Sequence, residues 1–181
     1  YKEYEGGKLV SEQAYFDGTV LYPKGQTLMR YTLAAISKTK IEGTNSSEVA
    51  QAVRRAMQYR YLCDVPWEGL SVDAKMTTEA TAAARACEML GRLSHQPPNP
   101  GMSEAEYTLA KFGASHSNLS MGSGIARSVD SYMHDSDPSN IDRVGHRRWV
   151  LFPPMLKTAF GGAGRYSAMR VMDKSRSEVP D

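Results

Sequence analysis

Apolar residues recur every three or four positions along two long segments, and this spacing predicts two amphipathic helices. The first begins at Asn45, where Glu48 can complete a capping box, and it ends before Pro66. The second runs from about Asp73 to Leu90 and is followed by Gly91, a residue suited to a left-handed helix stop. Its apolar face is rich in alanine, which allows close packing against a neighbouring element.

Two shorter helical segments follow. Ser103 and Glu106 form a second capping box for a helix that Gly113 closes, and apolar residues between Ile125 and Met133 again recur at helical spacing. Between them, the stretch 115–124 is rich in serine and glycine, which predicts a polar loop. A cluster of turn-forming residues at 135–140 ends this part of the chain.

The C-terminal part changes character, because short runs of β-branched and aromatic residues replace the helical spacing. The segments 149–152, 158–164 and 166–172 are predicted to be β-strands joined by short breaks. The glycines at 161–164 lack the Lys-Ser/Thr pair of a phosphate-binding loop, and we interpret them as allowing a strand to pack closely or bend. Helices followed by strands predict an α+β layered domain rather than a doubly wound nucleotide-binding fold.

The two ends of the chain differ from this central domain. Asp17-Gly18 lies between two short apolar runs and predicts a β-hairpin, whereas the segment 27–36 fits neither the helical nor the strand period. Residues 174–181 form a polar tail. We therefore divide the chain into an N-terminal extension (1–45), a main domain (46–173) and the tail. Because the first residue is Tyr1 rather than Met, we expect any export signal to lie upstream.

Composition narrows the classes of function. The 181 residues are 41% hydrophobic, enough for one ordinary core, and the net charge of +2 from 22 basic and 20 acidic residues disfavours a nucleic-acid partner. The longest apolar runs have four residues, far too few to span a membrane. Cys63 and Cys87 are either joined in a disulfide or are free thiols, and we favour free thiols because unpaired cysteine often serves as a small buried hydrophobe.

Candidate chemistry centres on the histidines. His95 and His146 lie at the ends of predicted elements, where side chains can face a cleft, whereas His134 lies in a polar turn and is interpreted as an ordinary histidine. His116 lies between two serines, but the sequence has no nucleophile-elbow motif. The arginines at 143, 147 and 148 could bind an anion, although the aspartates at 135, 137 and 142 favour a salt-bridged loop.

Three segments together resemble the CAP superfamily, the family of cysteine-rich secretory proteins, antigen 5 and pathogenesis-related 1 proteins, in its bacterial secreted branch. They are Leu93-Ser94-His95-Gln96-Pro97, Ser117-Asn118-Leu119 and Val144-Gly145-His146-Arg147-Arg148-Trp149, the last followed by the glycine-rich strand near Gly161. The likeness covers residues from about Ser46 to Asp173. It implies a three-layer α-β-α sandwich with a central antiparallel sheet, and a cleft in which His95 and His146 face each other.

The resemblance also implies a divalent metal, often zinc, held in that cleft by two histidines and two glutamates. Here Ser117 stands where the first glutamate belongs, next to Asn118, and Asp135 takes the place of the second. Because a catalytic zinc site typically uses three protein ligands, His95 and His146 with at most Asp135 predict weak metal affinity. His116 could act as a further nitrogen ligand, and for Asp135 we favour a structural carboxylate over a ligand.

The function expected from these features is that of a secreted or cell-surface binding module. Its cleft, lined by His95, His146, His116, Ser117, Asn118 and Asp135, would take a small ligand, lipid, glycan or protein. Two alternatives remain open at this point. One is a metal-assisted hydrolase that uses the cleft histidines, and the other is a structural module of a larger surface protein. Because no nucleophile, base and orienting group are recognisable together, we favour binding without catalysis.

Overall fold

The computed structural model describes residues 2–5, 8–12, 15–16, 20–21, 26–138, 140 and 142–178. The chain divides into two compact units, Tyr1–Thr39 and Lys40–Asp181. The second unit contains all the residues considered as candidates for function.

The N-terminal unit contains two strand pairs and a helix. β1 (Lys2–Glu5) pairs with β2 (Lys8–Glu12), and β3 (Tyr15–Phe16) pairs with β4 (Val20–Leu21), both antiparallel. The β3–β4 pair matches the predicted hairpin, whose Asp17-Gly18 turn lies outside the described residues. Helix α1 (Gln26–Lys38) occupies the segment that the sequence left unassigned. Its apolar residues are partly consecutive, which explains why they form no single helical stripe in the sequence.

The second unit is built around a four-stranded sheet. Its order is β5 (Ser71–Val72), β7 (Lys157–Ala163), β8 (Tyr166–Arg170) and β6 (Ser117–Met121). The pairs β7–β8 and β8–β6 are antiparallel, whereas the short β5 runs parallel to β7, so the sheet is mixed. The predicted α+β class is confirmed.

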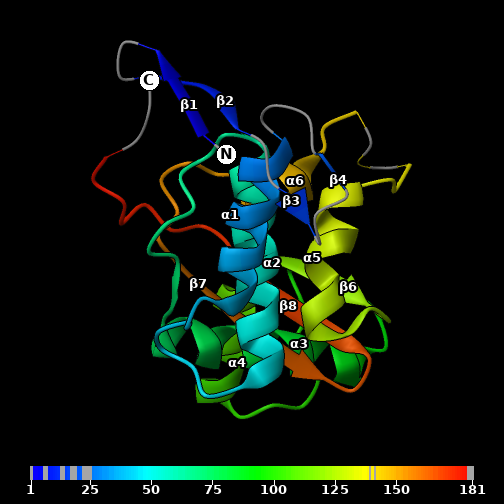
Figure 1. Cartoon of the computed structure of the whole chain (residues 1–181). Helices are drawn as coiled ribbons and strands as arrows, with labels where there is room; N and C mark the ends of the chain where they lie inside the picture. Colours follow the sequence, from blue (N-terminus) through cyan, green and yellow to red (C-terminus); the bar gives the residue numbers. More distant parts are fainter. Residues whose placement is uncertain are drawn as a thin grey trace. The chain divides into compact units, whose positions relative to one another are not determined.

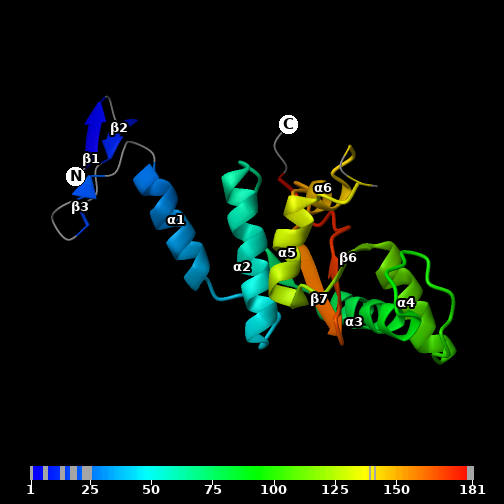
Figure 2. The same cartoon turned by 90° about the vertical axis from the view of Figure 1, so that its right-hand side faces the viewer.

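Helices cover both faces of this sheet. Helix α3 (Ala74–Leu90) packs on β7 and β8, and α4 (Glu104–Ser115) packs on α3. On the opposite face lie α2 (Ser47–Leu62) and α5 (Gly124–His134), which also pack on each other. Figure 2 shows these three layers edge-on, and Figure 1 shows the same elements turned by 90°.

The helix boundaries follow the predicted capping signals with corrections at α2 and α4. Helix α4 does not end at Gly113 as predicted but continues through it to Ser115. Ser103 caps α4 and Gly91 ends α3 with a left-handed φ of 66°, both as predicted. Helix α3 begins after Asp73, near the predicted start, and the Asp73 side chain caps it. For α2, however, the cap is Ser46 rather than Asn45, because the Ser46 hydroxyl accepts from the amide of Val49. Glu48 does not close a capping box. Its carboxylate accepts from the backbone N–H of Ile125 at 3.1 Å, joining α2 to the start of α5.

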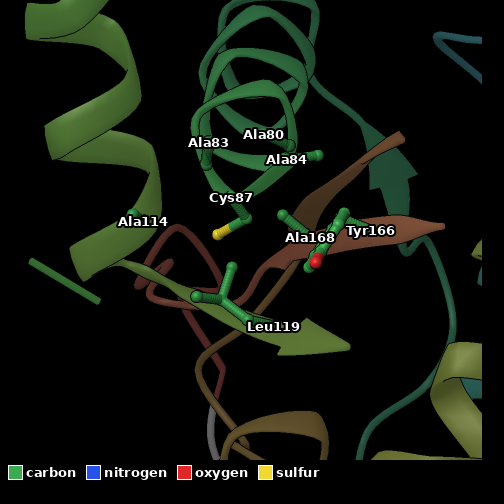
Figure 3. Packing of buried hydrophobic residues seen from close by; sticks show 8 residues of the cluster. All are labelled: Ala80, Ala83, Ala84, Cys87, Ala114, Leu119, Tyr166 and Ala168. Atoms are coloured by element: carbon green, nitrogen blue, oxygen red, sulfur yellow. The ribbon is translucent and has the colours of Figure 1, made fainter. Parts of the chain in front are cut away.

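Small residues bring α3 close to the sheet. Alanines of α3 pack with Cys87, Leu119 and Tyr166 in a buried cluster that Figure 3 shows from close by. Gly161 of β7 belongs to this contact, because a Cβ added there would lie 2.2 Å from the Thr81 backbone nitrogen. The interpretation of the glycine-rich strand as a close-packing strand is therefore confirmed at Gly161.

Two predicted elements are wrong. The expected polar loop at 115–124 contains strand β6, whose serines and asparagine are buried against β8 and the helices. The expected strand at 149–152 is instead the end of helix α6 (Gly145–Val150) and the turn that follows it. In both cases buried polar contacts, which a hydrophobic pattern does not record, override local propensity.

Candidate functional site

A cavity of about 350 Å³ lies where the start of β6 meets α6 and the loop after α3. Residues from these three distant segments line it together, namely His95, Ser117, Asn118, His146, Arg148 and Trp149. Because β6 is an edge strand of the sheet, the residues at its start can be reached from both helical layers. The structure thus brings together four of the six predicted cleft residues.

His95 lies just beyond α3 and is anchored by the end of α4. Its Nδ1 lies 2.9 Å from the carbonyl oxygen of Ala114. A carbonyl only accepts, so Nδ1 carries the hydrogen in this contact. In the neutral imidazole, Nε2 is then the nitrogen that offers a lone pair to a ligand.

His146 is held more firmly, from three sides. Its Nδ1 lies 2.8 Å from Oδ1 of Asp135, and its ring stacks on that of Tyr132 with a centroid distance of 5.7 Å. Its backbone carbonyl accepts from Nδ2 of Asn118 at 2.9 Å, which ties α6 to the edge strand. The carboxylate holds the hydrogen on Nδ1, so Nε2 again presents the lone pair.

Asp135 acts behind His146 rather than on the cavity wall. This buried residue ends α5 in a left-handed conformation and accepts from the backbone N–H of Arg147 at 3.1 Å and from Asn140. Burial alone would raise its pKa, but the hydrogen bonds from His146, Arg147 and Asn140 outweigh burial and lower the pKa of Asp135 below its ordinary value. Its charge orients the imidazole, as the preference for a structural carboxylate anticipated.

Arg60 holds the segment that follows α6 in place. It was not among the residues identified from the sequence. Its guanidinium is buried and donates to five backbone carbonyls, those of Pro66, Val150, Phe152, Pro153 and Met155. Burial lowers the pKa of Arg60 to about 10, so it remains protonated at neutral pH. Arg60 lies seven residues after Val53, in register with the apolar stripe of α2. A charged residue in that register was the signal available in the sequence.

The remaining histidines lie elsewhere. His116 stacks on Phe112 with a centroid distance of 4.1 Å, and its Nδ1 contacts the Phe112 carbonyl and the Ser115 hydroxyl. It is not among the residues that line the histidine cavity. His134 lies at the end of α5 and lines a different cavity of about 750 Å³, together with Cys63 and Arg147.

Within the arginine cluster, Arg147 does not form the salt bridge that we expected of this loop. Arg147 donates to the carbonyl oxygens of Met133 and His134 at 2.7 and 3.0 Å, and so completes the C-terminus of α5 instead of pairing with an aspartate. Arg148 is exposed and makes no side-chain hydrogen bond or ion pair with any described residue. Its guanidinium donors are therefore uncommitted within the described part of the chain.

The residues present do not fit a tight metal site. Among the described residues, no group of three or more His, Cys, Asp or Glu side chains is placed to hold a metal ion. The cavity offers two imidazoles, one fewer than the three protein ligands typical of catalytic zinc, and both oxygens of Asp135 already accept hydrogen bonds. Cys63 and Cys87 are free thiols, one exposed and one buried.

Comparison with known proteins adds no relative. No family model matches the chain, and no curated protein or solved structure is significantly similar to it. The resemblance to the CAP superfamily therefore stays a prediction carried by the three sequence segments. Separately, the described helices include none with the length and apolar character required to cross a bilayer.

Proposed function

We propose that the second unit is a ligand-binding domain of the CAP type, exported to the cell surface or beyond, and that the histidine cavity is its binding site. The observation that carries this proposal is the shared cavity of His95 and His146. These residues are far apart in the sequence, since His95 follows α3 and His146 lies in α6, and they line one hollow of about 350 Å³. A volume of this size suits a small molecule or one residue of a polymer.

Binding without turnover is supported by what surrounds the imidazoles. A serine nucleophile needs an imidazole within hydrogen-bonding distance. Ser117 lines the cavity, but its Oγ is enclosed and makes no hydrogen bond to any described residue. Ser115 also lines this cavity, and its Oγ lies 2.8 Å from Nδ1 of His116, but the hydroxyl donates its hydrogen to the Phe112 carbonyl and not to an imidazole base. The described residues therefore assemble no nucleophile and base in the histidine cavity.

A ligand screen tests the proposal. Small molecules that bind the intact chain would be found by saturation-transfer NMR and then tested against His95→Ala and His146→Ala. Both substitutions should weaken the hits, because both side chains line the cavity. His134→Ala is the matched control, since His134 lines the other cavity. Hits that bind all three variants equally well would contradict the proposal.

A second candidate function, hydrolysis by an activated water, is favoured by the Asp135–His146 contact. A carboxylate that holds Nδ1–H leaves Nε2 as a general base, which is the arrangement found in catalytic triads. A panel of ester, peptide and glycoside substrates should show turnover that Asp135→Asn and His146→Ala abolish. Absence of turnover across the panel would leave the binding function as the one supported.

A further inference from the structure

We propose that the ligand of the histidine cavity is a small organic oxyanion, a carboxylate or phosphate attached to an uncharged ring, with its charge on Arg148 and its ring against Trp149. This inference rests on the proposed binding function. It deepens that function by naming the chemical class of the ligand. Three features of the cavity carry it.

The first feature is the charge of the lining. Two arginines, Arg143 and Arg148, line the cavity, and none of its lining residues is acidic. The carboxylate of Asp135 lies behind His146 and accepts from three donors. The exposed guanidinium of Arg148 therefore contributes positive charge to a wall that has no acidic residue, which favours an anion.

The second feature is the set of hydrogen-bonding groups. Arg148 is exposed and unpaired within the described part of the chain, and its planar guanidinium matches the two oxygens of a carboxylate or phosphate. Ser117 lines the same cavity, although its Oγ is itself enclosed and makes no hydrogen bond to a described residue. The hydrogen bonds to the ligand therefore come from Arg148.

The third feature is an adjoining hollow that is aromatic rather than charged. A smaller cavity of about 220 Å³ is lined by Gly145, Arg148, Trp149 and Phe152, and so shares three residues with the histidine cavity. The rings of Trp149 and Phe152 meet edge to face at 5.3 Å. Arg148 thus lies between a polar cavity and an aromatic wall, and this arrangement suits a ligand with a charged group next to an uncharged ring.

Tryptophan fluorescence provides the test. The sequence has two tryptophans, so Trp67→Phe leaves Trp149 as the single reporter. The probes are glucose 6-phosphate, glucuronate and uncharged glucose. We expect at least one charged probe to change the Trp149 emission with an affinity about tenfold or more above that of glucose, the value of one charge-assisted hydrogen bond. The phosphate and carboxylate probes compared with each other identify the preferred anion.

Substitutions then assign the charge. Arg148→Ala should abolish the preference for the charged probes, and Arg148→Lys should restore it in part, because lysine keeps the charge but not the planar pair of donors. Arg165→Ala, which removes an exposed arginine at the β7–β8 turn, should leave the preference unchanged.

The results of these experiments distinguish the proposed oxyanion ligand from the binding function on which that proposal rests. Equal affinity for glucose and its charged derivatives, or a preference that survives Arg148→Ala, would overturn the inference. The binding function would still stand if those probes lost affinity in His95→Ala. If neither charged probe perturbs Trp149 at ~10 mM, where a millimolar Kd would be visible, the inference is also wrong. The histidine-dependent ligand screen decides the binding function separately.

Discussion

The layer between α3 and the sheet and the segment around α6 are stabilised in opposite ways. The first is an apolar contact formed by alanines, Cys87, Leu119 and Tyr166, in which the small side chains of α3 let this helix approach the strands (Figure 3). The second is held by polar groups: Arg60 on backbone carbonyls, Asp135 on His146, and Asn118 on the His146 carbonyl. Close packing fixes the frame of the domain, and hydrogen bonds fix the candidate site at its edge.

This difference has a functional consequence. The close-packed layer between α3 and the sheet leaves no room for a ligand, because the surfaces of the helix and the strands already fit each other. A hydrogen-bonded segment can leave donors and acceptors uncommitted, as it does at Arg148 and at the Nε2 atoms of the two cavity histidines. The site is therefore found where the molecule is stabilised by polar contacts. Four substitutions separate the two kinds of stabilisation.

Arg60→Met should have the largest effect. The change keeps an unbranched side chain of similar length but leaves several buried carbonyls without donors, so we expect the free energy of unfolding to fall by about 3–5 kcal/mol. Urea denaturation measures it. The exposed control Arg165→Met should change stability by less than about 0.5 kcal/mol. A loss below about 1 kcal/mol for Arg60→Met would show that the α6 segment does not depend on this guanidinium.

Gly161→Ala tests the apolar layer. The new Cβ would meet the backbone of α3, which cannot yield as a side chain can, so we expect a loss of about 1–3 kcal/mol. Gly162→Ala is the matched control on the other face of β7, because its closest neighbour there is the flexible side chain of Ile125 at 3.1 Å. It should cost less than about 1 kcal/mol. Equal losses for the two variants would contradict the close approach of α3.

Asp173→Asn shows how pH distinguishes polar from apolar stabilisation. Burial would raise the pKa of Asp173, but hydrogen bonds from the amides of Leu156 and Lys157 and from Ser175 outweigh it and lower the pKa. A carboxyl whose pKa is lowered by folding stabilises the protein at pH values above its ordinary unfolded pKa, and it loses that contribution as the pH falls through the lower folded pKa.

We therefore expect Asp173→Asn to cost about 1–2 kcal/mol at neutral pH and the gap from the parent chain to close in acid. Denaturation curves at several pH values measure the gap. The loss caused by Gly161→Ala should stay nearly constant over the same range, because no titrating group makes that contact. A gap for Asp173→Asn that widens in acid would refute the assignment.

Glu106→Gln should have the smallest effect. Glu106 pairs with Arg85 at 2.6 Å between α4 and α3, but the two side chains are 30% and 57% exposed. An exposed pair contributes little, so we expect a change below about 0.5 kcal/mol, and a smaller one in high salt. A loss comparable to that of Gly161→Ala would mean that charge, and not close packing, joins these two helices.

The sequence predicted the apolar frame well for a physical reason. Helices α2 and α3 bury one face each, and such a face leaves a periodic record in the order of residues. The caps at Asp73 and Ser103 were also predictable, because a cap acts within one turn of the helix. Strands β7 and β8 were recognisable by their β-branched, aromatic and glycine residues.

The polar region was less predictable, because its contacts join residues that are distant in the sequence. Strand β6 was mistaken for a loop since its buried serines and asparagine read as turn formers. Helix α6 was mistaken for a strand since Trp149 and Val150 favour strands locally, whereas Arg60 holds its end from ninety residues away. No periodicity indicated His95 and His146. Their place at the ends of predicted elements and the family resemblance did.

NMR of the imidazole rings shows whether His95 and His146 belong to one binding site. Nitrogen-edited spectra of the four histidine rings would be recorded while glucose 6-phosphate or a hit from the ligand screen is added. If they share a site, the signals of His95 and His146 shift together along one binding curve, while the signal of His134, in the other cavity, stays unchanged. If only one of the two rings responds, or if the two rings follow different binding curves, the two histidines do not share a site and the proposed binding site is wrong.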